Sequence, residues 1–344
     1  WVGVATRREA LALRAAGDDG PLVCWLPTPG GDFTEAVRAG IDVTAHTADQ
    51  VSEIAVAAAA VGRPARLQLK IDTGLSRAGV AREGWPDLVA AAVAARESGQ
   101  VEVTGLWSHF AASDWPHDPA NDAQEAAFAE AVAVADRAGL GGVRHLCNSA
   151  ATLLRPSAHY DAVRPGLALY GLDPAPEEAT VAKTELRPAM RVTSRLALVK
   201  RIAAGEAVSY GHTWVAPTDT WIGLVPVGYA DGIPRAAGNR AEVTVDGVRR
   251  AIRGVICMDQ FVIDLGPDRP GAIVPRIGEE VVILGNPVHG EPAAQEWAQW
   301  CETISYEIVT RLGGRFERRW IDSDESNSGH PKAGTAETQA VRED

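Results

Sequence analysis

The stretch WVGVATRREALALRAAG, residues 1–17, pairs a short apolar strand pattern with a helical pattern that closes on Gly17. Six more strand-like runs follow along the first half of the chain, at residues 22–26, 42–46, 65–72, 103–110, 143–149 and 163–171. Apolar and β-branched runs of this length suit strands that are buried on both faces. Helical patterns that end on glycine lie between them, at 47–62, 83–99 and 121–139. Repeated βα units of this kind predict a parallel sheet.

These repeats predict an α/β fold, a TIM-type (β/α)8 barrel that lacks its first βα unit. A closed barrel of this type needs eight strands, whereas the chain offers seven candidates and begins inside a βα unit. The alternative on pattern alone is an open, doubly wound sheet. The sequence contains neither G-x-G-x-x-G after a strand nor G-x-x-x-x-G-K-[ST], so no nucleotide-binding fingerprint favours that alternative.

The pattern changes after residue 184, where strands follow strands without helices between them. Strand-like runs lie at 191–202, 220–230, 241–252, 254–265 and 279–285, and one helix is predicted over 293–312. Asp246-Gly247 between two such runs predicts a β-hairpin. We therefore expect an incomplete barrel domain over 1–183, a C-terminal mostly β domain over 184–321 and a disordered polar tail over 322–344.

Composition excludes several classes of function. The net charge of −12 disfavours nucleic-acid binding, and no apolar run approaches the ~20 residues that span a bilayer. No secretory signal is visible, so we expect a cytoplasmic protein without a membrane partner. No C-x-x-C or H-E-x-x-H motif occurs, so no metal site is predicted. The four cysteines therefore indicate reduced thiols; they are Cys24, Cys147, Cys257 and Cys301.

Polar side chains follow four of the predicted strands, where a barrel of this type builds its active site. They are Lys70, Asp72, Arg77, Ser108, His109, Asn148, Ser149 and Arg164, with Gly166 in the last turn. His109 alone would equally suit a satisfied core histidine, and Arg164 a pair with a surface carboxylate. The β domain adds Tyr210 and Tyr229 beside glycines in polar turns, where a tyrosine is often a packing residue.

These stretches together resemble the alanine racemase family of pyridoxal phosphate (PLP) enzymes. Matching motifs occur in the family's order across almost the whole chain: LKIDTGLSRAGV (69–80), LWSHFAASD (106–114), RHLCNSAATL (144–153), VRPGLALYGL (163–172), LRPAM (186–190), VSYGHTW (208–214), PVGYADG (226–232), GVICMDQFVIDL (254–265) and TISYEIVTRL (303–312). The resemblance implies an isomerase with a PLP-binding barrel and a C-terminal β domain. It also implies a homodimer whose active sites are shared across the interface.

The resemblance implies roles in substrate binding and proton transfer. Tyr210 would be one of two acid/base residues and would take the α-proton of the L substrate in the partner's active site. Arg77 would bind the substrate carboxylate, which a guanidinium fork suits. Lys70 holds a position that can be carbamylated, and the resulting anion would orient Arg77. The remaining residues implied in substrate binding are Met258, Asp259 and Tyr229.

The resemblance also implies a cofactor site. Arg164 would hydrogen-bond the pyridine nitrogen of PLP, and because arginine does not readily give up a proton, that nitrogen would stay unprotonated. The cofactor would then be a weaker electron sink, which favours racemisation over transamination. His109 would connect Arg164 to Tyr210. The rest of the implied cofactor-binding set is Asn148, Ser149, Gly166, Leu167 and Tyr306.

The family's second base is a lysine that anchors PLP in a V-K-A-x-A-Y-G-H-G-like stretch at the end of the first barrel strand. No such stretch occurs, and the lysines are Lys70, Lys183, Lys200 and Lys332. A Schiff base needs a primary amine beside the cofactor. We therefore expect roughly 50–70 residues to be missing before Trp1, on the scale of a βα unit with its lead-in, and the chain as printed to be inactive.

Three functions stay open at this point. The first is interconversion of L- and D-alanine to supply D-alanine for peptidoglycan. The second is racemisation of serine or another small amino acid, since a methyl and a hydroxymethyl group can be discriminated by one or two pocket residues. The third is a catalytically dead, PLP-fold binding protein.

Overall fold

The computed structural model describes residues 1–26, 28, 30–176 and 184–321. The chain divides into two compact units, Trp1–Arg191 and Val192–Asp344, and each is described by itself. The predicted domain boundary at 183/184 falls at the edge of a segment outside the described residues, as does the predicted tail over 322–344. No helix within the described ranges is long and apolar enough to cross a membrane.

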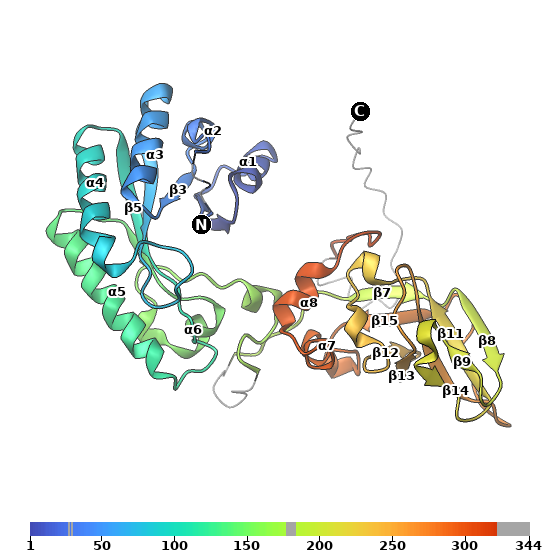
Figure 1. Ribbon diagram of the computed structural model, residues 1–344. Coiled ribbons are helices and arrows are strands. Elements are labelled where there is room, and N and C mark those ends of the chain that lie inside the picture. The colour runs from blue at the N-terminus through green and yellow to red at the C-terminus, as the bar shows by residue number, and fades with distance from the viewer. Residues whose placement is uncertain (27, 29, 177–183, 322–344) are drawn as a thin grey trace. The chain divides into compact units, whose positions relative to one another are not determined.

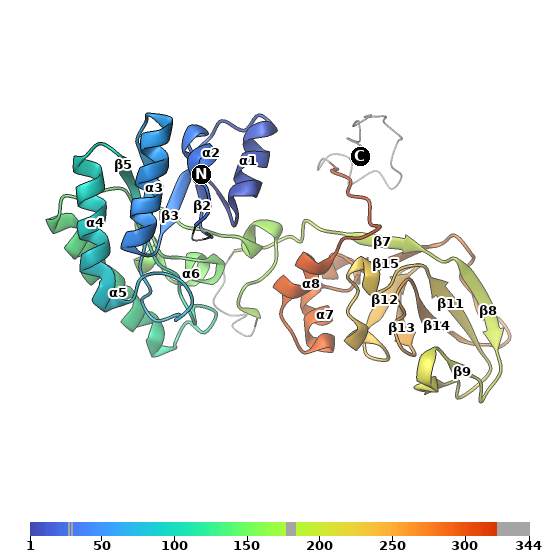
Figure 2. The same cartoon turned by 45° about the horizontal axis from the view of Figure 1, so that its top comes forward.

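The first unit holds a six-stranded, wholly parallel sheet in the order β1-β2-β3-β4-β5-β6. Each strand thus pairs with the next one along the chain, as in a barrel wall, and the sheet forms a half-barrel. Figures 1 and 2 show helices α1–α5 arrayed along the strands. The strands are β1 (Val2–Val4), β2 (Leu22–Cys24), β3 (Asp42–Ala45), β4 (Ala65–Lys70), β5 (Val101–Trp107) and β6 (Val143–His145). The helices are α1 (Arg7–Ala15), α2 (Thr34–Arg38), α3 (Ala48–Val61), α4 (Trp85–Glu97), α5 (Pro119–Arg137) and α6 (Ser149–Leu154).

The predicted helix ends of this unit are confirmed where capping chemistry sets them. Thr47 precedes α3 and its side chain accepts a hydrogen bond from the Gln50 N–H, while Gly62 ends the helix with φ +77°. A side-chain acceptor at the first turn and a left-handed glycine at the last satisfy backbone groups that the helix leaves unpaired. The core between helices and strands is apolar, and Phe33, Leu67, Leu106 and Phe128 are fully buried in it.

The predicted seventh strand over 163–171 is wrong. Residues Leu167–Tyr170 form a 3-10 helix instead, and only a bridge between His145 and Ala162 continues the sheet. Pro165 has no N–H to donate to a ladder. Gly171 then ends the short helix in the left-handed region with φ +72°. The apolar composition of this stretch therefore serves a turn, and the described sheet remains open at β6.

The second unit is built on an antiparallel sheet in the order β7-β15-β12-β13-β14-β11-β8, with a separate β9–β10 pair. The Asp246-Gly247 hairpin is confirmed: it joins β12 to β13, and both residues have positive φ, 49° and 70°, as the favoured two-residue hairpin turn requires. The strands are β7 (Val192–Arg195), β8 (Leu198–Ile202), β9 (Ala207–Val208), β10 (Trp214–Val215), β11 (Thr220–Val225), β12 (Glu242–Val245), β13 (Val248–Arg253), β14 (Phe261–Pro267) and β15 (Glu280–Leu284).

The single helix predicted over 293–312 is divided in two, α7 (Ala294–Cys301) and α8 (Ser305–Arg311). The break lies at Glu302, which has φ +57°. Arg240 donates to the carboxylate of Glu302 and to the Trp300 carbonyl, 3.4 Å away. The contact with Arg240 therefore stabilises the turn at Glu302, which the helical periodicity of the sequence does not predict.

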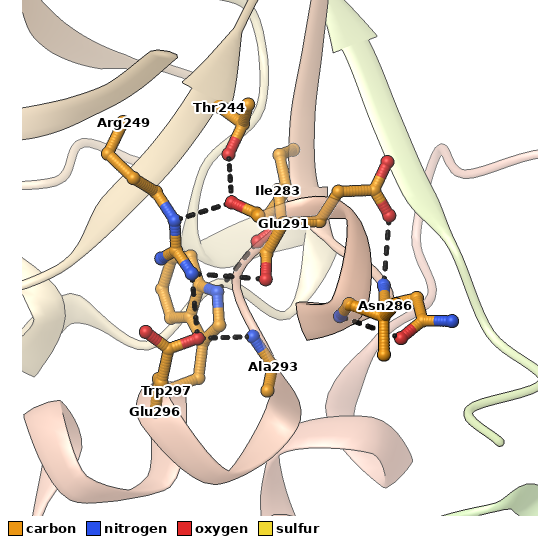
Figure 3. A network of polar contacts seen from close by, with 10 residues as sticks. Thr244, Arg249, Ile283, Asn286, Glu291, Ala293, Glu296 and Trp297 are labelled. Atoms are coloured by element: carbon orange, nitrogen blue, oxygen red, sulfur yellow. Dashed lines mark hydrogen bonds and ion pairs between the residues drawn. The ribbon is translucent and has the colours of Figure 1, made fainter. Parts of the chain in front are cut away.

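Helix α7 is fixed to the sheet by a polar network, shown in Figure 3. Arg249 on β13 donates to the Gly290 and Glu291 carbonyls and to the Glu296 carboxylate. The Glu296 carboxylate also accepts from the Ala293 N–H at the start of α7, and Trp297 Nε1 donates to the Ile283 carbonyl of β15 at 2.7 Å. These bonds order the segment between β15 and α7, so the network is structural.

Candidate active site

The loop after β4 is a closed turn that presents Arg77. The Asp72 carboxylate accepts the N–H groups of Gly74 and Ser76 at 2.9 and 3.1 Å, and Ser76, directly before Arg77, has φ +55°. Gly79 closes the turn at φ +117°, where a Cβ would lie 2.6 Å from the backbone of Ile71 and Asp72. Backbone hydrogen bonds from Asp72 to Val80 and from Val80 to Lys70 complete it. The exposed Arg77 side chain thus stands on a constrained loop.

Lys70 is a buried cation in this unit. It ends β4 with 4% of its surface exposed, and its Nζ lies 4.0 Å from the centroid of the Trp107 ring. Burial, with the nearby charges of Arg164 and Arg77, lowers its pKa to about 8. No ion pair joins its Nζ to a carboxylate of the described residues. A lysine in such surroundings is a readily deprotonated amine.

Arg164 is the centre of the site. Its Nη2 donates to the Ser108 and Leu146 carbonyls at 2.8 and 3.1 Å and to His109 Nδ1 at 3.2 Å. Its Nη1 donates to His145 Nδ1 at 2.9 Å, and its Cζ lies 5.0 Å from the Trp107 ring centroid. Five interactions therefore hold the guanidinium in one orientation. The alternative of a pair with a surface carboxylate does not occur among the described residues.

His109 lies beside this guanidinium as a neutral imidazole. Burial and the charge of Arg164 lower its pKa to about 3. Because a guanidinium can only donate, His109 Nδ1 must accept, and Nε2 then carries the ring proton. The result is a hydrogen-bond donor aimed away from Arg164.

Two residues of this site, His145 and Gln124, escaped the sequence analysis. His145 accepts from Arg164 and stacks on Trp107, with ring centroids 5.6 Å apart and planes at 9°. Gln124 on α5 donates to the His109 carbonyl and to Thr73 Oγ1 and accepts from the Ala111 N–H, so it ties the loops after β4 and β5 together. His145 lies within the strand predicted over 143–149, and the observed strand β6 ends at it; that place near a strand end was the signal available for it. The sequence gives no comparable signal for Gln124, which lies on a helix.

A backbone turn and α6 form the second part of the site. Ser149 Oγ accepts from the Gly166 N–H at 2.8 Å and the Ala168 N–H at 3.4 Å. A Cβ on Gly166 would meet nothing within 4 Å, so this turn faces open space. Leu167 begins the 3-10 helix with its N–H at the free end. Asn148 caps α6 through the Ala151 N–H and accepts from Ser113 Oγ.

The remaining predicted site residues belong to the second unit, where three loops meet. Ser209, which precedes Tyr210, has φ +66° and donates its hydroxyl to the Val255 carbonyl at 2.6 Å. The Tyr229 and Ala230 N–H groups donate to the Cys257 and Met258 carbonyls. The structure thus brings the loops of Tyr210, Tyr229 and Met258 together.

The side chains of these loops are exposed to solvent, and one of them forms an ion pair. Tyr210 is 73% exposed, and Tyr229, Met258 and Tyr306 are also exposed. Asp259 pairs with Arg315 at 3.0 Å, and Arg315 in turn clasps Asp231 through two hydrogen bonds. Tyr306 lies on α8. The site residues of this unit therefore include exposed apolar and phenolic side chains.

The residues of the first unit fit a cofactor that carries negative charge. Lys70, Arg77 and Arg164 form a cationic group without an ion-pair partner among the described residues. The open Gly166 turn adds the Leu167 N–H, a backbone donor of the type that binds phosphate. Lys200, the other described lysine, is exposed on β8. Within the described ranges, no group of three His, Cys, Asp or Glu side chains could hold a metal ion.

Comparison with known proteins identifies relatives of the whole chain. The alanine racemase N-terminal domain family matches residues 1–174, and the alanine racemase C-terminal domain family matches residues 189–320. An alanine racemase of Streptomyces coelicolor is 51% identical over 328 residues, which cover 94% of this chain and 83% of the relative. The crystal structure of alanine racemase from Streptomyces lavendulae superposes with a TM-score of 0.90 at 50% identity, covering 95% of this chain and 85% of that one.

A further solved structure bears on the cofactor. Alanine racemase from Bartonella henselae, with covalently bound pyridoxal phosphate, matches with a TM-score of 0.81 at 25% identity and covers 93% of this chain and 84% of that one. The matched lengths lend no support to the expected N-terminal truncation or to the expected inactivity of the chain.

Proposed function

The chain belongs to the alanine racemase family, and from that premise we propose that it is a PLP-dependent isomerase that interconverts L- and D-alanine by a two-base mechanism. The observation that carries the proposal is Arg164, whose guanidinium is fixed by two carbonyls, two imidazoles and an indole face. A guanidinium held in this way is a permanent donor to a flat heterocycle that has a lone pair in its plane.

Arg164 would donate to the pyridine nitrogen and keep it unprotonated. When bound, PLP supplies the electron-withdrawing system that makes the α-hydrogen of the amino acid acidic. By keeping that nitrogen unprotonated, Arg164 would limit the withdrawal and favour racemisation over transamination. Ser149 and the backbone of Gly166 and Leu167 would hold the phosphate, together with Tyr306, and Asn148 would support them by capping α6.

Tyr210 would be the base for the L substrate and would act in the partner subunit's site of a homodimer. His109 accepts from Arg164 through Nδ1, so its ring proton lies on Nε2. The phenolic oxygen of Tyr210 would accept a hydrogen bond from this Nε2–H. This hydrogen bond would orient the phenolic oxygen for its work as a general base. Met258, Asp259 and Tyr229, which share one loop cluster with Tyr210, would shape the entrance for the substrate.

Arg77 would bind the substrate carboxylate, and Lys70 would be carbamylated. In that step the neutral Lys70 amine attacks carbon dioxide, a C–N bond forms and one proton is released. A pKa of about 8 leaves roughly a tenth of the amine neutral at pH 7. The carbamate would place a negative charge between Lys70's cationic neighbours Arg77 and Arg164, and the charge imbalance of the site would fall.

A chemical test would identify the lysine that anchors PLP and serves as the second base. Protein from its native source is loaded with PLP, reduced with borohydride, digested and sequenced, and the lysine that carries the pyridoxyl group is the anchor and second base. The proposal expects one labelled lysine per chain. A protein that takes up PLP without any labelled lysine would contradict the two-base mechanism and favour a binding protein.

The substrate is tested by rates of conversion for L-alanine, L-serine and other small amino acids. We propose alanine, used to supply D-alanine for peptidoglycan, because the relatives are alanine racemases. A higher kcat/KM for serine than for alanine would assign the chain to the alternative activity. Four unpaired cysteines and the net charge of −12 support a cytoplasmic enzyme that binds neither nucleic acid nor membrane.

A further inference from the structure

Gln68 lies behind the residues that hold Arg164. It is fully buried on β4, two residues before Lys70, and its Oε1 lies 2.8 Å from His145 Nε2. His145 Nδ1 lies 2.9 Å from Arg164 Nη1. The three side chains therefore form one line, Gln68–His145–Arg164, that runs from the strand wall to the guanidinium.

The chemistry of the two ends decides where the proton of His145 lies. A guanidinium only donates, so His145 Nδ1 must present its lone pair to Arg164. In a neutral imidazole the other nitrogen then carries the proton, and Nε2–H must find an acceptor. Gln68 Oε1 is that acceptor, which also fixes the orientation of the amide.

Gly105 makes room for the amide. It pairs with Gln68 across β4 and β5, and a Cβ on it would lie 2.9 Å from Gln68 Cδ, 3.0 Å from the Val143 carbonyl oxygen and 3.1 Å from Gln68 Oε1. Its backbone has no positive φ that would call for glycine. The space that a Cβ would need is occupied by the Gln68 side chain and by the Val143 carbonyl.

A purely structural role accounts poorly for a glutamine here. Gln68 Nε2 is buried and has no hydrogen-bond partner among the described residues, and an unpaired buried donor costs stability. An aliphatic side chain of similar size would fill the same space without that cost. What glutamine adds is an uncharged acceptor directed at one ring nitrogen.

We propose that Gln68 is a positioning residue for Arg164, acting through His145: it holds the imidazole in the neutral form, protonated on Nε2, that can accept from Arg164. The choice of an amide over a carboxylate is central, because a carboxylate facing Nε2–H would stabilise the doubly protonated ring. A proton on Nδ1 would then face the guanidinium donor, and the bond that orients Arg164 would be lost.

The charged groups around His145 act in the same direction. Burial, followed by the charges of Arg164 and Lys70, holds the pKa of His145 well below its usual range, and Trp107 covers one face of the ring. No acidic group contributes. A negative charge at position 68 would be the first anion in contact with this ring.

The test is ¹⁵N NMR of the full chain with labelled histidine, and it needs neither cofactor nor activity. In the unsubstituted protein, His145 should be neutral, with Nε2 protonated and Nδ1 unprotonated, from about pH 5 to about pH 9. In Gln68→Glu its pKa should rise into that range and Nδ1 should become protonated. A His145 with a protonated Nδ1 in the unsubstituted protein, or no change in Gln68→Glu, would overturn the proposal.

Two further variants keep the test decisive. Gly105→Ala retains the glutamine but displaces its amide, so His145 Nε2–H should lose its acceptor and its ¹⁵N signal should shift while Nδ1 stays unprotonated; an unchanged spectrum would contradict the proposal. Gln100→Glu adds the same charge one residue before β5, and it should leave His145 unchanged. If the pKa of His145 rose equally in Gln100→Glu and Gln68→Glu, the added negative charge alone would explain the change. That result would overturn the specific role of Gln68.

The consequence for the reaction rests on the proposed function. PLP affinity and racemisation in Gln68→Glu should fall below the raised pKa of His145 and recover above it. The two claims fail separately: a protein without racemase activity whose His145 behaves as predicted contradicts only the proposed function. Full activity in Gln68→Glu at every pH, with His145 protonated, would contradict only the positioning role.

Discussion

Lys70 Nζ lies 4.0 Å from the centroid of the Trp107 ring and has no described carboxylate within ion-pair distance. The indole face and the nearby charge of Asp72 compensate in part for burying this charge, and a cation over an aromatic face is worth about 0.5–2 kcal/mol. Arg164 approaches the same ring, at 5.0 Å. Two cations on one indole make an environment that favours loss of a proton from Lys70 or arrival of an anion.

The buried charge should destabilise the protein at neutral pH. The folded state lowers the pKa of Lys70 from 10.5 to about 8, so the unfolded chain binds more protons between those values and stability rises with pH across that window. Lys70→Met should therefore raise the free energy of unfolding by up to about 3 kcal/mol at pH 7 and by much less at pH 10. Urea unfolding in bicarbonate-free buffer measures this, and the exposed Lys200→Met is the matched control. An equal gain in the free energy of unfolding at pH 7 and pH 10 would contradict the prediction.

Carbamylation of Lys70 should be visible directly. Protein equilibrated with ¹³C-bicarbonate should give a carbamate carbon signal that is absent from Lys70→Gln and present in Lys200→Gln. The reason is that Lys70 combines a lowered pKa with neighbouring cations that stabilise the product. A spectrum without a carbamate signal, at a pH where the amine is largely neutral, would refute the assignment.

Gly79→Ala should unfold the loop that carries Arg77. Its Cβ would lie 2.6 Å from backbone atoms at φ +117°, and neither can yield without breaking the loop's hydrogen bonds, so a loss of about 3 kcal/mol or more is expected. Gly62→Ala, at φ +77° with nothing within 4 Å, should cost only about 1 kcal/mol. Thermal unfolding measures the loss of stability in both variants. Similar losses would contradict the prediction, because they would show that the positive φ, and not the close approach to Ile71 and Asp72, sets the cost.

Arg164→Lys keeps a positive charge but removes the fork of donors. Loss of one or two charged hydrogen bonds, at about 1.5–3 kcal/mol each, predicts a roughly 10- to 100-fold or larger fall in kcat/KM and weaker PLP binding. Arg66→Lys, at a partly buried ion pair with Asp42 at the other end of β4, is the control and should leave kcat/KM unchanged. Equal activity of Arg164→Lys and the unsubstituted protein would remove Arg164 from the site.

Tyr210→Phe should stop proton transfer on one face of the substrate α-carbon only. Loss of a general base costs about 10²–10⁴-fold, so exchange of the α-hydrogen of L-alanine with deuterium should nearly stop. Exchange from D-alanine, which uses the opposite face, should persist. NMR of both enantiomers in D₂O distinguishes the faces, and equal loss for both would assign Tyr210 a structural role.

Local chemistry explains which parts of the fold could be predicted. The six described strands, the Thr47 and Gly62 caps and the Asp246-Gly247 hairpin all follow from residues next to one another in sequence. The 163–171 segment was predicted wrongly because its apolar run outweighed Pro165 and the Gly166 turn around Ser149. The break at Glu302 depends on Arg240, some sixty residues away, and no local pattern contains it.

The candidate site divides in the same way. Lys70, Arg164 and His109 could be predicted from their places at strand ends, and the structure does bring them together. His145 and Gln124 were missed because their roles are set by partners on other elements. A hydrogen-bond partner across the sheet or from a covering helix has no fixed spacing in sequence.

Formation of D-alanine tests the central claim most directly. L-alanine is incubated with protein from its native source, with and without PLP, and the enantiomers are separated by chiral chromatography. We predict PLP-dependent conversion to an equal mixture, because enantiomers have the same free energy in water. L-alanine that stays unconverted by the PLP-loaded protein, or conversion that does not require PLP, would contradict the assignment.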